Sequence, residues 1–133
     1  MSKPFKTIVP EPFKAIYDQW QFAPAVLAGG VIHISGQVGA NPADMSVPDE
    51  LETQLANIFG AIELILAQAG AKPSDVFSLT SYHVGDLHAQ MPVFIEAKSR
   101  FFGAPHPAWT AVGVSELALP GLMVEGSAMA VAP

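Results

Sequence analysis

Apolar side chains recur every three or four positions between residues 49 and 70, where the spacing along the chain is clearest. This period predicts a helix with one apolar face. The helix is expected to begin at the acidic residues Asp49, Glu50 and Glu52, because the helix dipole favours negative charge in the first turn. It is expected to end at Gly70, since glycine is common at helix C-termini. The apolar face consists of Leu51, Leu55, Ile58, Phe59, Ile62, Ile65, Leu66 and Ala69. Because this stripe is one-sided, we expect the helix to lie on a sheet and to leave its other face in water.

Alternating and β-branched runs on both sides of this helix predict strands. The segment AVLAGGVIHISG, residues 25 to 36, has two short strands joined at Gly29 and Gly30, a pair typical of two-residue hairpins. Further strands are expected at residues 76–84, 108–114 and 122–131.

A second helix is expected at residues 89 to 102, with Pro92 in its first turn and Gly103 at its end. The resulting order is β-β-α-β-α-β-β. It predicts an α+β sandwich with two helices on one face of a mainly antiparallel sheet. Prolines at 4, 10 and 12 predict that residues 1 to 23 have no regular structure.

Composition narrows the class of protein. The length of 133 residues suits a single domain. Because 50% of the residues are hydrophobic and only 14% are charged, we expect a homo-oligomer that buries apolar surface between its subunits. Six basic against twelve acidic residues give a net charge of -6, which argues against nucleic-acid binding. There are no cysteines, no signal peptide and no apolar run long enough to span a membrane, which together predict a cytoplasmic protein.

Candidate chemistry is sparse. His83, Asp86 and His88 lie close in sequence, but their spacing is no known metal-ligand signature, so we expect no metal site. Ser35 and Gly36 follow a strand, either as a simple strand end or as a hydroxyl and an open amide presented to a ligand.

Glu125 lies inside the apolar run LMVEGSAMAV. A carboxylate in a buried strand is unfavourable unless it is paired, hydrogen-bonded or protonated. Glu125 is therefore either a sheet-edge residue that faces water or a general acid/base whose pKa is raised by burial.

Five segments occur together in the order and spacing of a known family: ISGQVG, AGAKPSDV, YHVGDL, PAWTAVGV and VEGSAMAV. The chain resembles the YjgF/RidA family of reactive-intermediate deaminases, formerly labelled endoribonuclease L-PSP. The resemblance covers residues 22 to 131 and leaves residues 1 to 21 as a lead-in. It implies a chorismate-mutase-like fold, a homotrimer with ligand clefts between subunits, and imine hydrolysis without a cofactor.

The resemblance also assigns roles to positions of this sequence. The family glutamate that activates water falls on Glu125, and the Ser-Gly step that lines the pocket falls on Ser35 and Gly36. The arginine that grips the substrate carboxylate falls on Trp109. The family's tyrosine and cysteine are replaced by Phe22 and Ala111, and its asparagine in the second helix has no counterpart. PAWTAVGV is most similar to the YjgH-like branch, which has tryptophan at this position.

The loss of the arginine changes the expected ligand. A guanidinium offers a charged fork to a carboxylate, while an indole offers one donor and no charge, a difference of about 1.5–3 kcal/mol. Arg100, the only arginine, is expected on the outer face of the second helix. The chain is therefore not expected to be a typical 2-iminobutanoate deaminase.

Two hypotheses for the site follow. In the first, Phe22 and Trp109 form an aromatic wall, Glu125 and the Ser35-Gly36 backbone form the polar end, and water adds to a C=N bond of a neutral or aromatic substrate. In the second, the same site binds a metabolite without chemistry. Ribonuclease activity follows only from the old family label, and the acidic charge counts against it.

Overall fold

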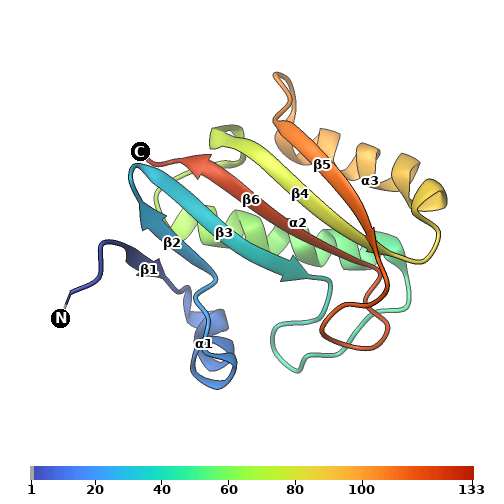
Figure 1. The fold of residues 1–133 in the computed structure, drawn as a ribbon, viewed down its shortest axis with the longest axis horizontal. Helices are drawn as coiled ribbons and strands as arrows, with labels where there is room; N and C mark the ends of the chain where they lie inside the picture. Colours follow the sequence, from blue (N-terminus) through green and yellow to red (C-terminus); the bar gives the residue numbers. More distant parts are fainter. Residues whose placement is uncertain (1) are drawn as a thin grey trace.

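Six strands form one sheet in the order β1-β2-β3-β6-β4-β5 (Figure 1). The computed structural model describes residues 2–133. Four pairings of neighbouring strands are antiparallel and the β4–β5 pairing is parallel, because α3 crosses between these two strands. The strands are β1 (Lys6–Ile8), β2 (Ala25–Ala28), β3 (Val31–Val38), β4 (Val76–Val84), β5 (Ala108–Val114) and β6 (Val124–Val131).

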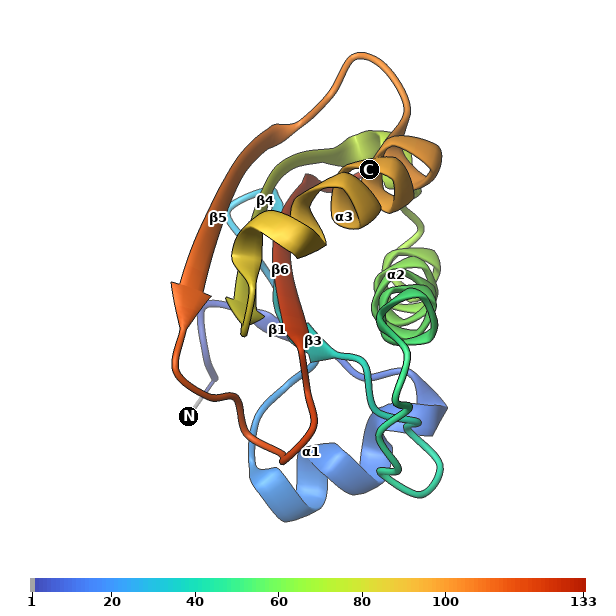
Figure 2. The ribbon, with the colours of Figure 1, turned by 90° about the vertical axis from the view of Figure 1, so that its right-hand side faces the viewer.

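Two long helices cover one face of this sheet, and Figure 2 shows them side by side on it. A short helix, α1, lies below the sheet in both views and apart from the other two. The helices are α1 (Lys14–Trp20), α2 (Leu51–Gln68) and α3 (Leu87–Phe102), with 3-10 turns η1 (Glu11–Phe13) and η2 (Pro73–Asp75). The arrangement confirms the predicted α+β sandwich. Within residues 2–133, no helix combines the length and the apolar character that crossing a membrane requires.

The predicted hairpin is confirmed. β2 and β3 pair antiparallel, and both connecting glycines have positive φ, 57° at Gly29 and 76° at Gly30. Two consecutive left-handed residues form the type I′ turn, whose twist matches that of the flanking strands. The predicted strands at 76–84 and 108–114 are confirmed as β4 and β5.

Three predicted boundaries differ from the structure. α2 begins at Leu51, so that Glu50 is its N-cap and only Glu52 is acidic in the first turn. α3 begins earlier than predicted because the Asp86 carboxylate accepts a hydrogen bond from the Ala89 amide at 3.1 Å and caps it, which places Pro92 inside the helix. β6 begins at Val124, after a turn at Gly121 with φ of 88°.

The prediction of no regular structure before residue 24 is wrong. Lys6–Ile8 pair with β2 as an edge strand, and helical turns occupy residues 11–20. The prolines are compatible with these elements because Pro12 lies in the first turn of η1, where no amide donor is needed.

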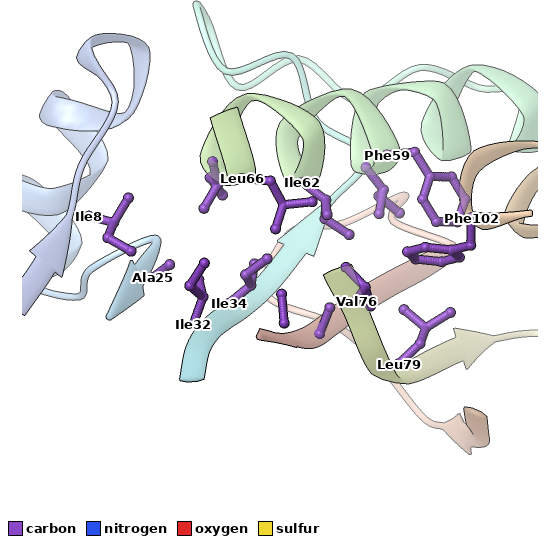
Figure 3. Packing of buried hydrophobic residues seen from close by; sticks show 14 of the residues in the cluster. Ile8, Ala25, Ile32, Ile34, Phe59, Ile62, Leu66, Val76, Leu79 and Phe102 are labelled. Carbon is purple, nitrogen blue, oxygen red and sulfur yellow. The ribbon is translucent and has the colours of Figure 1, made fainter. Parts of the chain in front are cut away.

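The core lies between α2, α3 and the sheet, and Figure 3 shows its side chains. The predicted apolar face of α2 packs on the central strands, and Ile62 is fully buried at 0% exposure. Among residues 2–133 no helix lies over the opposite face of the sheet, and Met129 and Val131 on that face of β6 are exposed at 36% and 56% (Figure 2). The described part of the chain therefore covers the sheet on one side only.

Candidate functional site

A cavity of about 250 Å³ lies beside the second half of β3. β2 pairs only with Val31–Ile34, so among residues 2–133 no strand pairs with residues 35–38 on that side. η1 and α1 close this side, and the loops of residues 39–50 and 115–123 close the end. Most lining side chains are apolar or aromatic, including Trp20 and Phe22, and the polar ones are Gln37, Asn57 and Glu125.

Glu125 is the only lining residue with an ionisable side chain. Its neighbours in β6, Val124 and Gly126, are buried on the side of α2, so Glu125 points to the other face of the sheet. Burial raises the pKa of the Glu125 carboxyl above its ordinary value of 4.5. Within residues 2–133 the carboxylate forms no salt bridge and accepts no side-chain hydrogen bond. The Glu125 carboxyl group is therefore half-buried rather than at a wet sheet edge, and its role as an acid/base stays a prediction.

Gly36 has a defined reason to be glycine. A Cβ at this position would lie 2.7 Å from the Cδ atom of Glu125 and would overlap its carboxyl group. The register of the β3–β6 pairing shifts between Ile34 and Gln37, around this residue. The close approach expected at Gly36 is therefore made by the carboxyl group of Glu125.

Ser35 has a different role from the hydroxyl donor expected at a cleft. Its hydroxyl donates to the carbonyl of Ala23 at 2.6 Å, and its amide donates to the carbonyl of Pro24 at 2.8 Å. Both bonds hold the segment that leads into β2, next to Phe22. Ser35 thus fixes one wall of the cavity from outside, while Phe22 lines the cavity with 39% of its surface exposed.

One buried amide, that of Gln54, holds the two loops of the cavity in place. Gln54 is fully buried, and its side chain bonds the carbonyls of Pro48 and Gly121 at 2.8 and 3.0 Å and the amide of Met123 at 2.9 Å. It therefore ties both cavity loops to the start of α2. Sequence reasoning missed Gln54, and its only signal is a polar residue within the apolar stripe of the helix.

Trp109 does not line this cavity. Its ring stacks on Phe94 of α3, with centroids 5.5 Å apart, and the Nζ atom of Lys98 lies 4.8 Å from the ring centroid. Ala111 lies farther along β5, also outside the cavity lining. One chain therefore does not bring Phe22 and Trp109 together, and the aromatic wall remains a prediction that requires a second copy.

The indole of Trp109 belongs to a buried chain of hydrogen bonds. Its Nε1 donates to Ser81 Oγ at 2.9 Å, which lies 2.7 Å from Nε2 of His83, and Nδ1 of His83 lies 2.9 Å from Oε1 of Gln90. Gln90 Nε2 donates to the carbonyl of Val84 at 2.7 Å, so its amide oxygen must accept from His83 Nδ1. Ser81 then donates to Nε2, and every group in the chain is satisfied.

This network accounts for His83, which the sequence placed near a possible metal site. Both ring nitrogens of His83 are engaged by Ser81 and Gln90. Within residues 2–133, no group of three or more histidine, aspartate and glutamate side chains could hold a metal ion. Arg100 is exposed on α3, as expected, at 3.5 Å from Glu96.

Comparison with known proteins decides the family. The family model described as endoribonuclease L-PSP matches residues 13–132. The chain belongs to this family. The RutC family protein YjgH of Escherichia coli is 32% identical over 112 residues, which cover 84% of each chain.

Other family members extend the comparison. The 2-iminobutanoate/2-iminopropanoate deaminase of Dermatophagoides farinae is 28% identical over 97 residues, covering 72% of this chain and 74% of that one. The solved structure of protein YjgH aligns with a TM-score of 0.87 at 29% identity over 98% of each chain. RidA from an Antarctic Psychrobacter aligns with a TM-score of 0.78 at 26% identity, over 98% of this chain and 99% of that one. The predicted family and its YjgH-like character are confirmed.

Substitution of Gly39 by alanine is expected to lower the free energy of unfolding by about 1–3 kcal/mol, because a Cβ atom there would lie 2.8 Å from the Cα atom of Gln54, in the backbone of α2. Gly60→Ala is the control, since nothing lies within 4 Å of a Cβ there and α2 should gain about 0.5–1 kcal/mol. Urea unfolding measures both. Equal effects of the two substitutions would contradict the assigned contact.

Substitution of Ser81 by alanine is expected to cost about 1–3 kcal/mol, because Trp109 Nε1 and His83 Nε2 both lose their partner. Ser127→Ala, on the other face of the sheet, should change stability by no more than about 0.5 kcal/mol. Denaturant unfolding of both variants checks this. A Ser81 variant as stable as the Ser127 variant would rule out the buried network.

Stability should depend on pH through Glu125. Its pKa is raised in the folded state by burial, so folding favours the protonated acid. This contribution is fully present below pH 4.5, the ordinary value, and is lost as pH rises through the folded pKa. Relative to Glu125→Gln, the unmutated protein should therefore lose stability as pH rises. Unfolding at pH values from about 4 to about 8 measures the difference. Glu63→Gln, at an exposed position of α2, is the control and should show no such trend.

Proposed function

We propose that this family member binds a small molecule in the Glu125 cavity and adds water to a C=N bond of a substrate that has no carboxylate. The observation that carries the proposal is a half-buried carboxylate without a counter-ion among residues 2–133, set in a largely apolar cavity. Family membership supports the reaction class, since one relative is named as a 2-iminobutanoate/2-iminopropanoate deaminase.

The chemistry needs one group that takes and returns a proton. The Glu125 carboxylate accepts a proton from water as the water oxygen bonds to the imine carbon and the π electrons move to nitrogen. The nitrogen then takes this proton from Glu125, which gives a neutral carbinolamine. The carboxylate next accepts the hydroxyl proton of the carbinolamine and passes it to the nitrogen, the C–N bond breaks, and ammonia leaves as the carbonyl forms. The sum is one imine and one water giving one carbonyl compound and one ammonia. No cofactor takes part in this scheme.

The restriction on the substrate follows from the cavity lining. The lining has no lysine, arginine or histidine side chain. The single donor of the Trp109 indole is already bonded to Ser81, and Arg100 is 74% exposed on α3. A substrate carboxylate would therefore meet only the carboxylate of Glu125, which disfavours small imino acids.

We further propose a homotrimer with ligand clefts between subunits. The uncovered face of the sheet supports self-association, because Val112, Met129 and Val131 expose apolar surface there. The substrate-binding roles expected for Trp109 and Ala111 stay predictions, because Trp109 packs on α3 of its own chain rather than on the uncovered face. Cytoplasmic localisation remains a prediction.

A second candidate function is metabolite binding without catalysis. The contacts of Trp109 support it. The resemblance assigns this residue to substrate binding, but its indole is hydrogen-bonded to Ser81 and stacked on Phe94. Ribonuclease activity is less well supported, since an acidic cavity in a chain of net charge -6 repels phosphates.

The catalytic proposal predicts selective imine hydrolysis. A pyridoxal-phosphate dehydratase supplies 2-iminobutanoate, an amine oxidase supplies a carboxylate-free aldimine, and semicarbazide traps what remains of either. The protein should speed hydrolysis of the aldimine and leave the imino acid nearly unchanged. Glu125→Gln should lose the activity by at least about 100-fold, since it cannot carry the proton.

Each alternative result has a clear meaning. No acceleration of either imine by the unmutated protein would favour the binding function. Rapid hydrolysis of 2-iminobutanoate would show that the cavity grips a carboxylate in another way.

The trimer is tested separately by light scattering at micromolar concentration. The expected mass is three times the 14.0 kDa of one chain. Met129→Lys, on the uncovered face, should shift the distribution towards monomer, while Leu64→Lys on the exposed side of α2 should not. A monomer in the unmutated protein would remove the intersubunit cleft.

A further inference from the structure

The charge of the cavity selects among possible ligands. Its lining contains one ionisable side chain, that of Glu125, and no basic one. The salt bridges formed by residues 2–133 join Lys72 to Asp75 and Arg100 to Glu96, and neither reaches Glu125. A ligand that enters the cavity thus meets one carboxylate with no counter-ion.

The two lining amides add acceptors to this carboxylate. Gln37 Nε2 donates to the carbonyl of Ser35 at 3.0 Å, and Asn57 Nδ2 donates to the carbonyl of Gly39 at 2.9 Å. Within residues 2–133, the side-chain oxygens of both amides accept no hydrogen bond. The polar part of the cavity therefore presents oxygen atoms, which suit a ligand group with several N–H donors.

The remaining walls suit the apolar part of the same ligand. Phe13, Trp20 and Phe22 give aromatic surface, and aromatic faces also attract cations. The volume of about 250 Å³ exceeds the roughly 150 Å³ that hold one benzene molecule in a protein interior. One ring with a short chain therefore fits.

We propose that the Glu125 cavity recognises a carboxylate-free primary amine or its iminium ion, with one ring or a compact alkyl group as the apolar part. The nitrogen cation lies against the Glu125 carboxylate, and the apolar part lies against the aromatic side chains of the lining. The inference rests on the proposed function only in taking this cavity as the ligand site. It names the class of ligand, whether or not the C=N bond is then hydrolysed.

Three probes of similar shape test the inference by isothermal titration calorimetry on the full chain: phenethylamine, phenethyl alcohol and phenylacetate. They carry a positive, a neutral and a negative group. The amine is expected to bind at least tenfold more tightly than phenylacetate, with the alcohol between them. Glu125→Gln should weaken amine binding at least tenfold and leave the alcohol within about twofold.

Glu63→Gln is the matched control, because it removes the same charge from an exposed position of α2 outside the cavity lining. It should leave all three affinities unchanged. The ranking of the three probes on the unmutated protein needs no variant, so a Glu125 variant that fails to fold does not remove the test.

Several results would overturn the inference: no binding of phenethylamine at millimolar concentration, equal binding of the three probes, tighter binding of phenylacetate, or an amine preference that persists in Glu125→Gln. The imine assay distinguishes this failure from that of the proposed function. If the protein binds the amine but hydrolyses neither imine, the inference holds and the catalytic proposal fails. If it hydrolyses an imine but binds the three probes equally, the catalytic proposal holds and the inference fails.

Discussion

The packing of α2 on the central strands is the interaction on which the rest of the structure depends. Leu55, Ile58 and Ile62 contact the sheet from one side and are at most 1% exposed. The helix lies on β3 and β6, two of the inner strands of the sheet, and Gln54 on the same helix holds the two loops that close the cavity. The position of the cavity walls therefore depends on the core, because α2 supplies both the apolar face that packs on the sheet and the amide that anchors the loops.

The site itself arises where regular pairing stops. β2 is too short to accompany the whole of β3, and the register of β3 against β6 shifts at the Ser35-Gly36 step. Such irregularities redirect side chains and end strand pairing, and they are common next to functional sites. Here they leave a space along β3 into which the Glu125 carboxyl reaches, with Ser35 bonding the segment that leads to α1.

The sequence predicted the elements with strong periodicity and missed those set by contacts distant in the chain. The α2 stripe, the Gly29-Gly30 hairpin and the β4 and β5 strands follow from local patterns. β1 depends on pairing with β2, which is distant in the chain. The start of α3 depends on the Asp86 cap, which is a local contact but leaves no mark in the apolar periodicity.

The candidate site shows the same division. The half-buried state of Glu125 could be expected from a carboxylate inside an apolar strand, whereas the destination of a side chain such as Trp109 could not. In this chain the Trp109 indole donates to Ser81 and its ring stacks on Phe94, so the side chain belongs to the hydrophobic and hydrogen-bonded interior. Sequence pattern alone does not show whether an aromatic side chain in a strand faces a cavity or the core.

The contact between Gly36 and Glu125 also constrains how this sequence can diverge. A side chain at position 36 would occupy the space that the Glu125 carboxyl group fills now, so that carboxyl group would have to move. Substitutions at the two positions therefore have non-additive effects. Once position 125 has lost its glutamate, a side chain at position 36 fits without displacing a carboxyl group. In a lineage that loses this glutamate, the first change thus makes the second easier to tolerate.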